Sequence, residues 1–330
     1  MRVKRLWAPA ILAALAACAS LKKTAAAPEL DLYLEQFDAV RTEGTDIYLR
    51  ASAIAEEKGG AKLEERRGAF EARLQALRIV EKYNRVLVGL ARGESPKTLK
   101  SGMKDVGSKL SSYRPSAQTT FAFAAAVPYL GTLISGAGFV SEALAKRSFT
   151  KAVRQAQEPI TAILDLLLLD SEPLETVLVE QTRKEEDAPR AAVDSLSSRF
   201  YKRLQTLKAA PETSDLLSAH NALREKAGLG PVPNPNPAAG APPRAADLEY
   251  LAMLTDHAAV NLQAYHRGEE RVAAERALSA RYRAALSAAK GALAALNGDS
   301  NPKRVAATGE FNAQALAMRQ QSVKLREASR

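Results

Sequence analysis

Cysteine, aromatic residues and histidine are all scarce in this chain of 330 residues, and each scarcity has a consequence. The one cysteine excludes a disulfide within the chain. Aromatic residues make up 5% of the sequence, fewer than a strand-rich fold uses. No stretch alternates apolar and polar residues convincingly with a period of two. We therefore expect an all-α protein, an elongated multi-helix bundle with a core of leucine, valine, isoleucine and alanine.

The motifs of common catalytic and metal sites are also missing. Residues 133–137 lack the first glycine of Gly-x-Ser-x-Gly, and Gly136 is not followed by the Lys-Ser/Thr of a phosphate-binding loop. His257 and His266 are nine positions apart, whereas two ligands on a zinc-binding helix are four apart. We expect these two histidines and His220 to be solvated residues on helix surfaces. The sequence predicts no metal or cofactor and no enzyme activity.

The first 17 residues have the three parts of a secretory signal peptide. Met-Arg-Val-Lys-Arg forms a basic start, and residues 6–14 form a short apolar run. That run is too short to span a bilayer as a helix. Leu15-Ala16-Ala17-Cys18 follows at the expected distance and contains the chain's one cysteine. The sequence around Cys18 therefore resembles the lipobox of bacterial lipoproteins, a resemblance confined to this N-terminal signal.

The resemblance implies that the Cys18 thiol receives a diacylglyceryl group and that signal peptidase II cuts between Ala17 and Cys18. Two or three acyl chains hold a protein stably in a membrane, whereas one chain is marginal. Ala19 replaces the aspartate that retains family members at the inner membrane. In a Gram-negative host, the resemblance therefore implies an outer-membrane protein that faces the periplasm.

Apolar residues recur every three or four positions over most of the chain, which predicts amphipathic helices. Ser95 and Pro96 are typical of the N-cap and first residue of a helix, and Gly228 is typical of a helix end. We expect Pro189 and Pro211 to start or bend helices. The predicted helices span residues 29–58, 61–92, 96 to about 110, 142–170, 172–208, 211–227, 246–267, 269–297 and 303–328.

Residues 228–244 contain six prolines with glycine and asparagine, a composition typical of an extended linker. It predicts a division into a signal peptide at 1–17, a lipidated tether at 18–28, a helical bundle at 29–227 and a C-terminal segment of three helices at 245–330. Two arrangements of that segment are open. It forms a small domain of its own, or it folds back and completes one larger bundle.

No charged residue occurs between Pro115 and Ser141. One interpretation is structural, a buried and kinked helix or hairpin at the centre of the bundle. The other is functional, a segment that enters a bilayer, and small residues suit helix packing in either medium. The residues of the possible membrane contact are Phe121, Phe123, Leu130, Leu133, Ile134 and Phe139.

These features favour a membrane-anchored lipoprotein of the cell envelope that acts as a helical binding or scaffolding module. The alternative is a membrane-active, pore-forming-like protein that inserts residues 115–141. A third hypothesis is an envelope enzyme with a site assembled from scattered carboxylates. The net charge of +10 falls to about +7 without the signal peptide and suits anionic partners, although an evenly charged surface explains it too. We expect membrane lipid, an envelope protein or an anionic cell-wall polymer as partner, and no specific nucleic acid.

Overall fold

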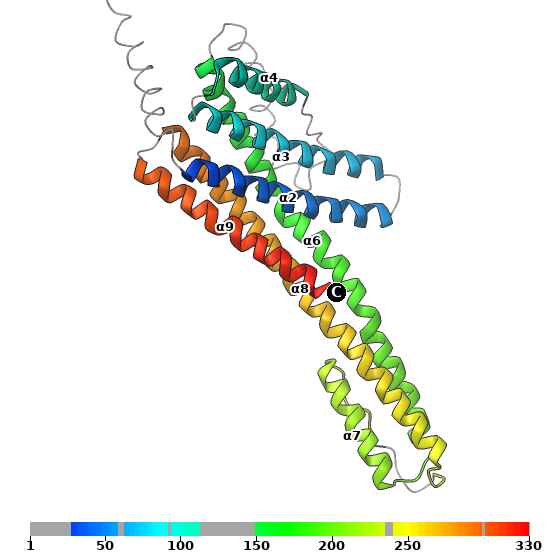
Figure 1. Ribbon diagram of the computed structural model, residues 1–330. Helices are drawn as coiled ribbons and strands as arrows, with labels where there is room; N and C mark the ends of the chain where they lie inside the picture. The colour runs from blue at the N-terminus through cyan, green and yellow to red at the C-terminus, as the bar shows by residue number, and fades with distance from the viewer. Residues whose placement is uncertain are drawn as a thin grey trace, which may run out of the picture. The chain divides into compact units, whose positions relative to one another are not determined.

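The computed structural model describes residues 28–58, 63–91, 94–112, 149–234, 240–298 and 301–329, and these form seven helices without a strand (Figure 1). The predicted all-α class is therefore confirmed for the described residues. The helices are α2 (Pro28–Lys58), α3 (Leu63–Ala91), α4 (Pro96–Ser112), α6 (Phe149–Leu204), α7 (Pro211–Lys226), α8 (Ala245–Gly298) and α9 (Asn301–Ala328).

The helix boundaries at Ser95 and Gly228 are confirmed, together with their chemistry. The Ser95 hydroxyl oxygen accepts a hydrogen bond from the Thr98 backbone N–H at 3.2 Å, as an N-cap does. Gly228 follows α7 with a φ of +64°, a conformation that costs glycine little. The Leu229 N–H then donates to the Arg224 carbonyl oxygen at 2.9 Å, which closes a Schellman motif.

Two pairs of predicted helices are single long helices. α6 continues through Pro189, so the predicted helices at 142–170 and 172–208 are one element over its described range. α8 continues through Gly268, which corrects the predicted break there, and the C-terminal segment has two helices instead of three. A Cβ at Gly268 would collide with the Glu186 side chain on α6. Gly268 therefore permits a close approach of two helices and does not end one.

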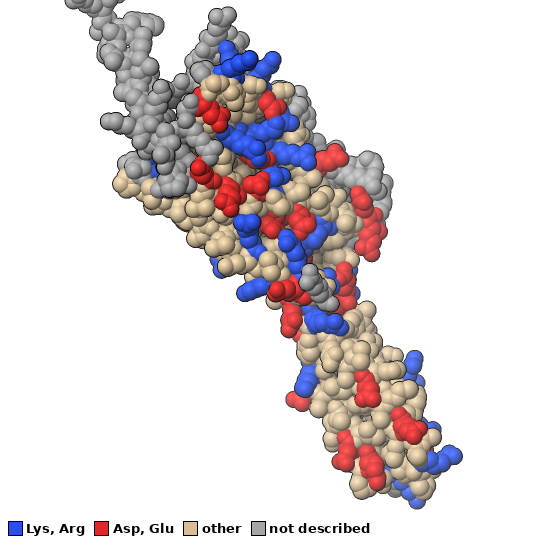
Figure 2. Space-filling model, viewed as in Figure 1, with Lys and Arg blue, Asp and Glu red and all other residues tan. Residues whose placement is uncertain are grey.

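Charges of both signs are interspersed on one face of the protein. In the view of Figure 2, acidic and basic side chains alternate over the described residues and form no large area of one sign. This distribution is typical of a solvated helical surface.

The chain forms two compact units. Unit 1 contains residues up to Val177 together with Ala277–Val323, and unit 2 contains Leu178–Arg276 and the C-terminal residues from Lys324. The limits of these units fall inside helices α6, α8 and α9.

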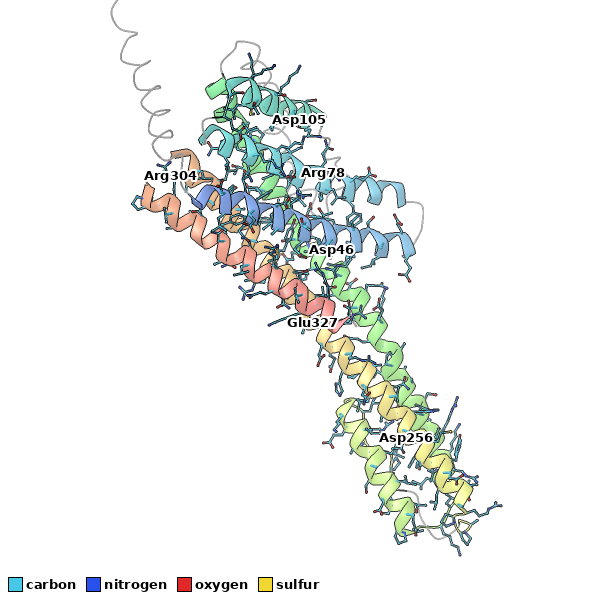
Figure 3. All side chains as sticks on the ribbon, in the orientation of Figure 1. Asp46, Arg78, Asp105, Asp256, Arg304 and Glu327 are labelled. Atoms are coloured by element: carbon cyan, nitrogen blue, oxygen red, sulfur yellow. The ribbon has the colours of Figure 1, made fainter. Side chains whose placement is uncertain are left out.

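In unit 1, α3 packs between α2 and α4, and Figure 3 labels one charged residue on each of them, Asp46, Arg78 and Asp105. The α2 side chains Tyr33 and Phe37 pack on Phe311 of α9, with ring centroids 5.1 and 6.5 Å apart, respectively. All three aromatic side chains are buried, so α9 is part of the same core as α2.

The core of unit 1 also buries an ion pair. Arg73 of α3 donates through Nε to the carboxylate of Asp170 on α6, and both side chains are almost fully buried. Tyr48 and Tyr282 lie nearby, with ring centroids 6.3 Å apart in an edge-on arrangement. Burial is the main cause that raises the pKa of both tyrosine hydroxyls, so both stay protonated. Gly44 permits this packing, because a Cβ there would lie 2.9 Å from the Tyr282 ring.

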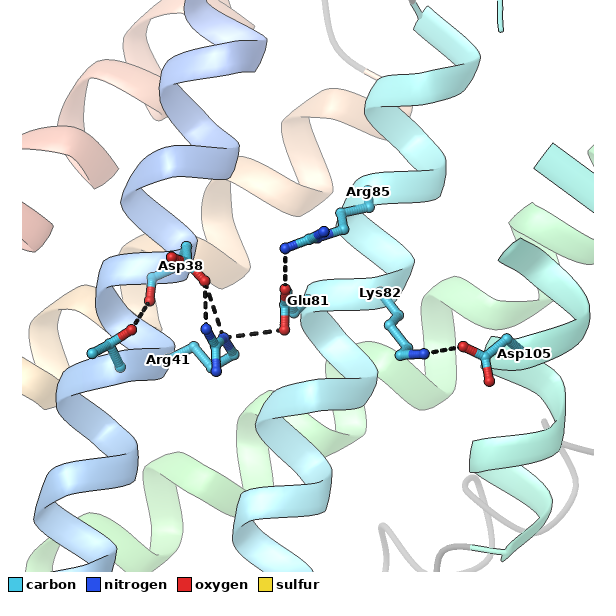
Figure 4. A network of polar contacts seen from close by, with 7 residues as sticks. Asp38, Arg41, Glu81, Lys82, Arg85 and Asp105 are labelled. Atoms are coloured by element: carbon cyan, nitrogen blue, oxygen red, sulfur yellow. Dashed lines mark hydrogen bonds and ion pairs between the residues drawn. The ribbon is translucent and has the colours of Figure 1, made fainter. Parts of the chain in front are cut away.

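Exposed and half-buried ion pairs join α2 to α3 and, separately through Lys82 and Asp105, α3 to α4 (Figure 4). Arg41 contacts Asp38 at 2.6 Å and Glu81 at 3.1 Å, and Glu81 also contacts Arg85 at 2.6 Å. Because such pairs contribute little each in water, we assign them to helix register rather than to stability.

Unit 2 is built from the end of α6, all of α7 and the start of α8. One apolar cluster joins the three helices, with Phe200 on α6, Leu217 on α7 and Leu251 on α8 among its members. At the N-terminus of α8, Asp247 accepts a hydrogen bond from the Arg244 N–H at 3.0 Å and forms an ion pair with Arg203. That pair connects the start of α8 to the end of α6.

The described parts of the proline-rich stretch pack against unit 2. The Asn221 amide holds the Val232 backbone on both sides, accepting from its N–H at 2.7 Å and donating to its carbonyl oxygen at 3.2 Å. Further along, the backbone N–H of Lys208 donates to the Ala241 carbonyl oxygen at 2.8 Å. These contacts fasten residues 229–234 to α7 and residues 240–244 to the segment between α6 and α7.

Candidate binding site on the open face of α6 and α8

The residues predicted for lipidation and membrane contact lie outside the described residues. They are the cleavage site at Ala17 and Cys18 and the apolar positions Phe121, Phe123, Leu130, Leu133, Ile134 and Phe139. For these residues the sequence predictions stay predictions.

The prediction for His220 is wrong, because this histidine is fully buried between three helices. Its Nε2 lies 2.9 Å from the Ser197 hydroxyl of α6, and its Nδ1 lies 3.3 Å from the Thr255 hydroxyl of α8. The imidazole stacks on Phe200 with ring centroids 4.2 Å apart. Burial, with a smaller effect of Arg224, lowers the pKa of His220 to about 4. His220 is therefore neutral at physiological pH.

The contact between Ser197 and His220 does not have the geometry of a nucleophile and its base. The Ser197 hydroxyl donates to the Val193 carbonyl oxygen at 2.7 Å and so accepts from the imidazole. The other imidazole nitrogen contacts a threonine hydroxyl, where a catalytic triad places a carboxylate. Both Ser197 and His220 are buried. We interpret the group as a polar contact that fixes how α7 packs on α6 and α8.

An open groove lies between α6 and α8 in unit 2, and it is the candidate functional site. Its rim and floor mix small, apolar and hydrogen-bonding side chains, a composition suited to binding another polypeptide surface. The lining residues from α6 are Ala192, Ser195, Leu196 and Arg199, and those from α8 are His257, Val260 and Asn261.

Large apolar side chains line up along α8 beside this groove. Tyr250, Met253 and Val260 are exposed by 39%, 42% and 62%, respectively. With His257 they recur at steps of three and four residues, which places them on one side of the helix. A row of exposed apolar side chains on one helix face is typical of an interaction site, whereas scattered exposed residues are not.

Helix α8 has two apolar sides, one buried and one exposed beside the groove. Its buried side carries Leu251, Leu254, Ala258 and Leu262, which pack toward α6 and α7. The hydroxyl of Thr255 faces His220 of α7, so α7 covers α8 away from the row that contains Met253. We call the exposed surface formed by the groove and by Tyr250, Met253 and Val260 the α6–α8 face.

Sequence reasoning missed this face, although the sequence contained a signal for it. Tyr250, Met253, His257 and Val260 form a second stripe beside the stripe that begins at Leu251. A helix with two apolar stripes packs on two surfaces, and the described residues of unit 2 supply only one of them. The prediction that His257 is at the surface is confirmed. His266 is half-exposed and contacts Glu269 at 3.2 Å, as a surface histidine does.

Metal sites and membrane-spanning helices are two further features that bear on function. Within the described ranges, no three histidine, cysteine or acidic side chains are placed to hold a metal ion. None of the described helices is both long enough and apolar enough to cross a membrane. Comparisons with family models, with curated proteins and with solved structures found no match.

Proposed function

We propose that this chain is a lipid-tethered helical module of the cell envelope that binds another polypeptide through the α6–α8 face and has no catalytic role. The observation that carries the proposal is the row of Tyr250, Met253 and Val260, exposed beside a groove. The Leu-Ala-Ala-Cys motif that ends at Cys18 supports the tether.

The tether limits the distance between the first helix of the module and the membrane. Residues 19–28 separate the acylated cysteine from the first helix, and ten extended residues reach on the order of 30 Å. The module therefore stays beside the bilayer, where it meets partners held by the same membrane. Confinement of this kind raises the effective concentration of partners in the same membrane, so a modest binding face is sufficient.

The composition of the α6–α8 face suits a binding site better than a catalytic one. Tyrosine and methionine are enriched at the centres of protein interfaces, and arginine is enriched among the residues that dominate binding. The face presents Tyr250 and Met253 from α8 and Arg199 from α6. An aromatic ring and a flexible thioether bury large areas against a partner helix, and the guanidinium supplies directed hydrogen bonds.

Photo-crosslinking in the native envelope tests the proposal. A photoreactive residue at Met253 should give a discrete crosslinked product, and Val260→Asp in the same chain should abolish it. A photoreactive residue at Glu310, an exposed position on α9, is the matched control. The same products from both positions, or none from Met253, would contradict binding through this face. Loss of membrane retention in Cys18→Ser tests the tether separately.

A second candidate function rests on the uncharged sequence 115–141, which lies outside the described residues. If this segment inserts, the mature protein should release dye from liposomes, and Leu133→Lys should abolish the release because a charge in the bilayer centre is costly. If the wild-type protein releases no dye, the insertion proposal fails and the binding module remains.

A further inference from the structure

We infer that the partner of the α6–α8 face is the same face of a second copy of this chain. The inference rests on the proposed function, because it names the partner of that binding surface. The two copies would be related by a twofold axis parallel to the helices. The α6 and α8 segments of the two copies then form an antiparallel four-helix arrangement, a common symmetric assembly.

The two helices of the face are complementary in size. α6 contributes small side chains at Ala188, Ala192 and Ser195, and α8 contributes the large side chains of Met253 and Val260. A twofold axis parallel to the helices places α8 of one copy over α6 of the other. Val260 of one copy then meets the small Ala192 of the other, which is the condition for close helix packing.

The register within unit 2 sets which residues meet. Ion pairs of Arg203 with Asp247 and of Arg271 with Glu185, the second at 3.0 Å, align α6 and α8 as antiparallel neighbours. Ala192 and Val260 line the same groove and so lie at the same level. Because the axis preserves height along the helices, Val260 of one copy meets Ala192 of the other.

The charges of the face are complementary under the same symmetry. Arg199 and Lys202 are exposed on α6, and Glu249 and Asp256 are exposed on α8, where Figure 3 labels Asp256. Helical spacing places Arg199 level with residues 253–257, so the twofold sets it opposite Asp256 of the second copy. Lys202 similarly meets Glu249, and symmetry doubles both contacts. The other twofold sets α6 against α6 and α8 against α8, so it would not pair the basic side chains of α6 with the acidic side chains of α8.

The expected dimer is weak in solution. Residues 188–202 span about 20 Å of helix, and two adjacent helices are about 20 Å wide, so the face measures roughly 400 Å². Stable interfaces usually bury about 800 Å² on each partner. Two copies anchored in one membrane have a far higher effective concentration than two copies in solution, so the tether and the face act together.

A charge exchange tests the pairing. The probe is the mature chain with Cys18→Ser, and sedimentation equilibrium measures its dimer dissociation constant. Arg199→Glu alone and Asp256→Arg alone should each raise that constant about tenfold or more, because each places like charges at two symmetric contacts. An equimolar mixture of the two variants should restore dimerisation, since the heterodimer again pairs opposite charges.

The controls are Lys226→Glu and Asp215→Arg, which make the same charge changes at exposed positions of α7. They should leave the dissociation constant within about twofold of the wild-type value, and circular dichroism should show equal helix content in all variants. Mixed Ala192→Cys and Val260→Cys chains should crosslink to each other faster than either does to itself.

A wild-type chain that stays monomeric up to millimolar concentration would overturn the inference, as would a mixture that does not recover dimerisation. If the chain is monomeric but the photoreactive residue at Met253 captures a different protein, the second copy is wrong as partner and the proposed binding face stands. If neither occurs, both proposals fail.

Discussion

Acidification should destabilise the protein in part through one buried residue, His220. The imidazole is fully buried against Ser197, Thr255 and Phe200, and its pKa is about 4, below the ordinary value of 6.5. In the unfolded chain the ordinary value returns. Between pH 6.5 and pH 4 the unfolded state therefore binds more protons than the folded state, and the free energy of unfolding falls as the pH falls.

The size of the effect follows from the same two pKa values. One proton taken up on unfolding lowers the free energy of unfolding by about 1.4 kcal/mol per pH unit within that window. From pH 7.5 to pH 4.5 the loss due to His220 should reach about 2.5 kcal/mol, and above pH 7 it should vanish. Carboxylates also titrate near pH 4, so the His220 contribution must be isolated by a variant.

Urea unfolding at pH 7.5, 6.5, 5.5 and 4.5 isolates this contribution when the mature Cys18→Ser chain is compared with the same chain carrying His220→Gln. His220→Gln keeps a hydrogen-bonding side chain but does not titrate, so its stability should fall less than that of the unsubstituted chain over this range. His257→Gln, at an exposed position, should change nothing. If His220→Gln and the unsubstituted chain lose stability in parallel, the claim that His220 is buried and neutral in the folded protein is refuted.

Three further substitutions test the packing by urea unfolding. Arg73→Leu should cost about 3–5 kcal/mol, because it leaves the buried carboxylate of Asp170 without its cation, and adding Asp170→Leu should recover most of the loss. Gly268→Ala should cost about 1–3 kcal/mol, because its Cβ would collide with Glu186. Asn221→Ala should cost about 1–3 kcal/mol, because two part-buried backbone groups of Val232 lose their hydrogen-bond partner.

The substitutions at Gly268 and Arg73 each have a comparison that can contradict them. Gly291→Ala is the matched control for Gly268→Ala, since a Cβ there meets no atom within 4 Å, and it should stabilise α8 by about 0.5–1 kcal/mol. Equal effects at the two glycines would disprove the close approach of α6 and α8. An Arg73→Leu loss that the double substitution does not reduce would show that packing, not charge, is lost.

Local signals in the sequence predicted the helices well. The three-to-four-residue periodicity gave the helical class, and Ser95, Pro211 and Gly228 gave helix ends, because caps and turns depend on a few adjacent residues. Gly268 shows where this reasoning fails. A glycine within a helix and a glycine after one look alike in sequence, and only the neighbouring helix distinguishes them.

The candidate site was less predictable for a related reason. His220 was expected at the surface because its own helix gave no reason for burial, but its partners Ser197 and Thr255 come from two other helices. The row at Tyr250 and Met253 was visible as a second apolar stripe on α8. Which of two stripes stays exposed depends on where α7 packs, and the sequence does not state that.

The intact mass of the protein extracted from the membranes of its native host tests the tether most directly. We predict a chain that begins at Cys18 and carries the added mass of a diacylglyceryl group, with or without a further acyl chain on its amine. A chain that retains residues 1–17, or one whose Cys18 thiol is unmodified, would contradict a lipid-tethered module.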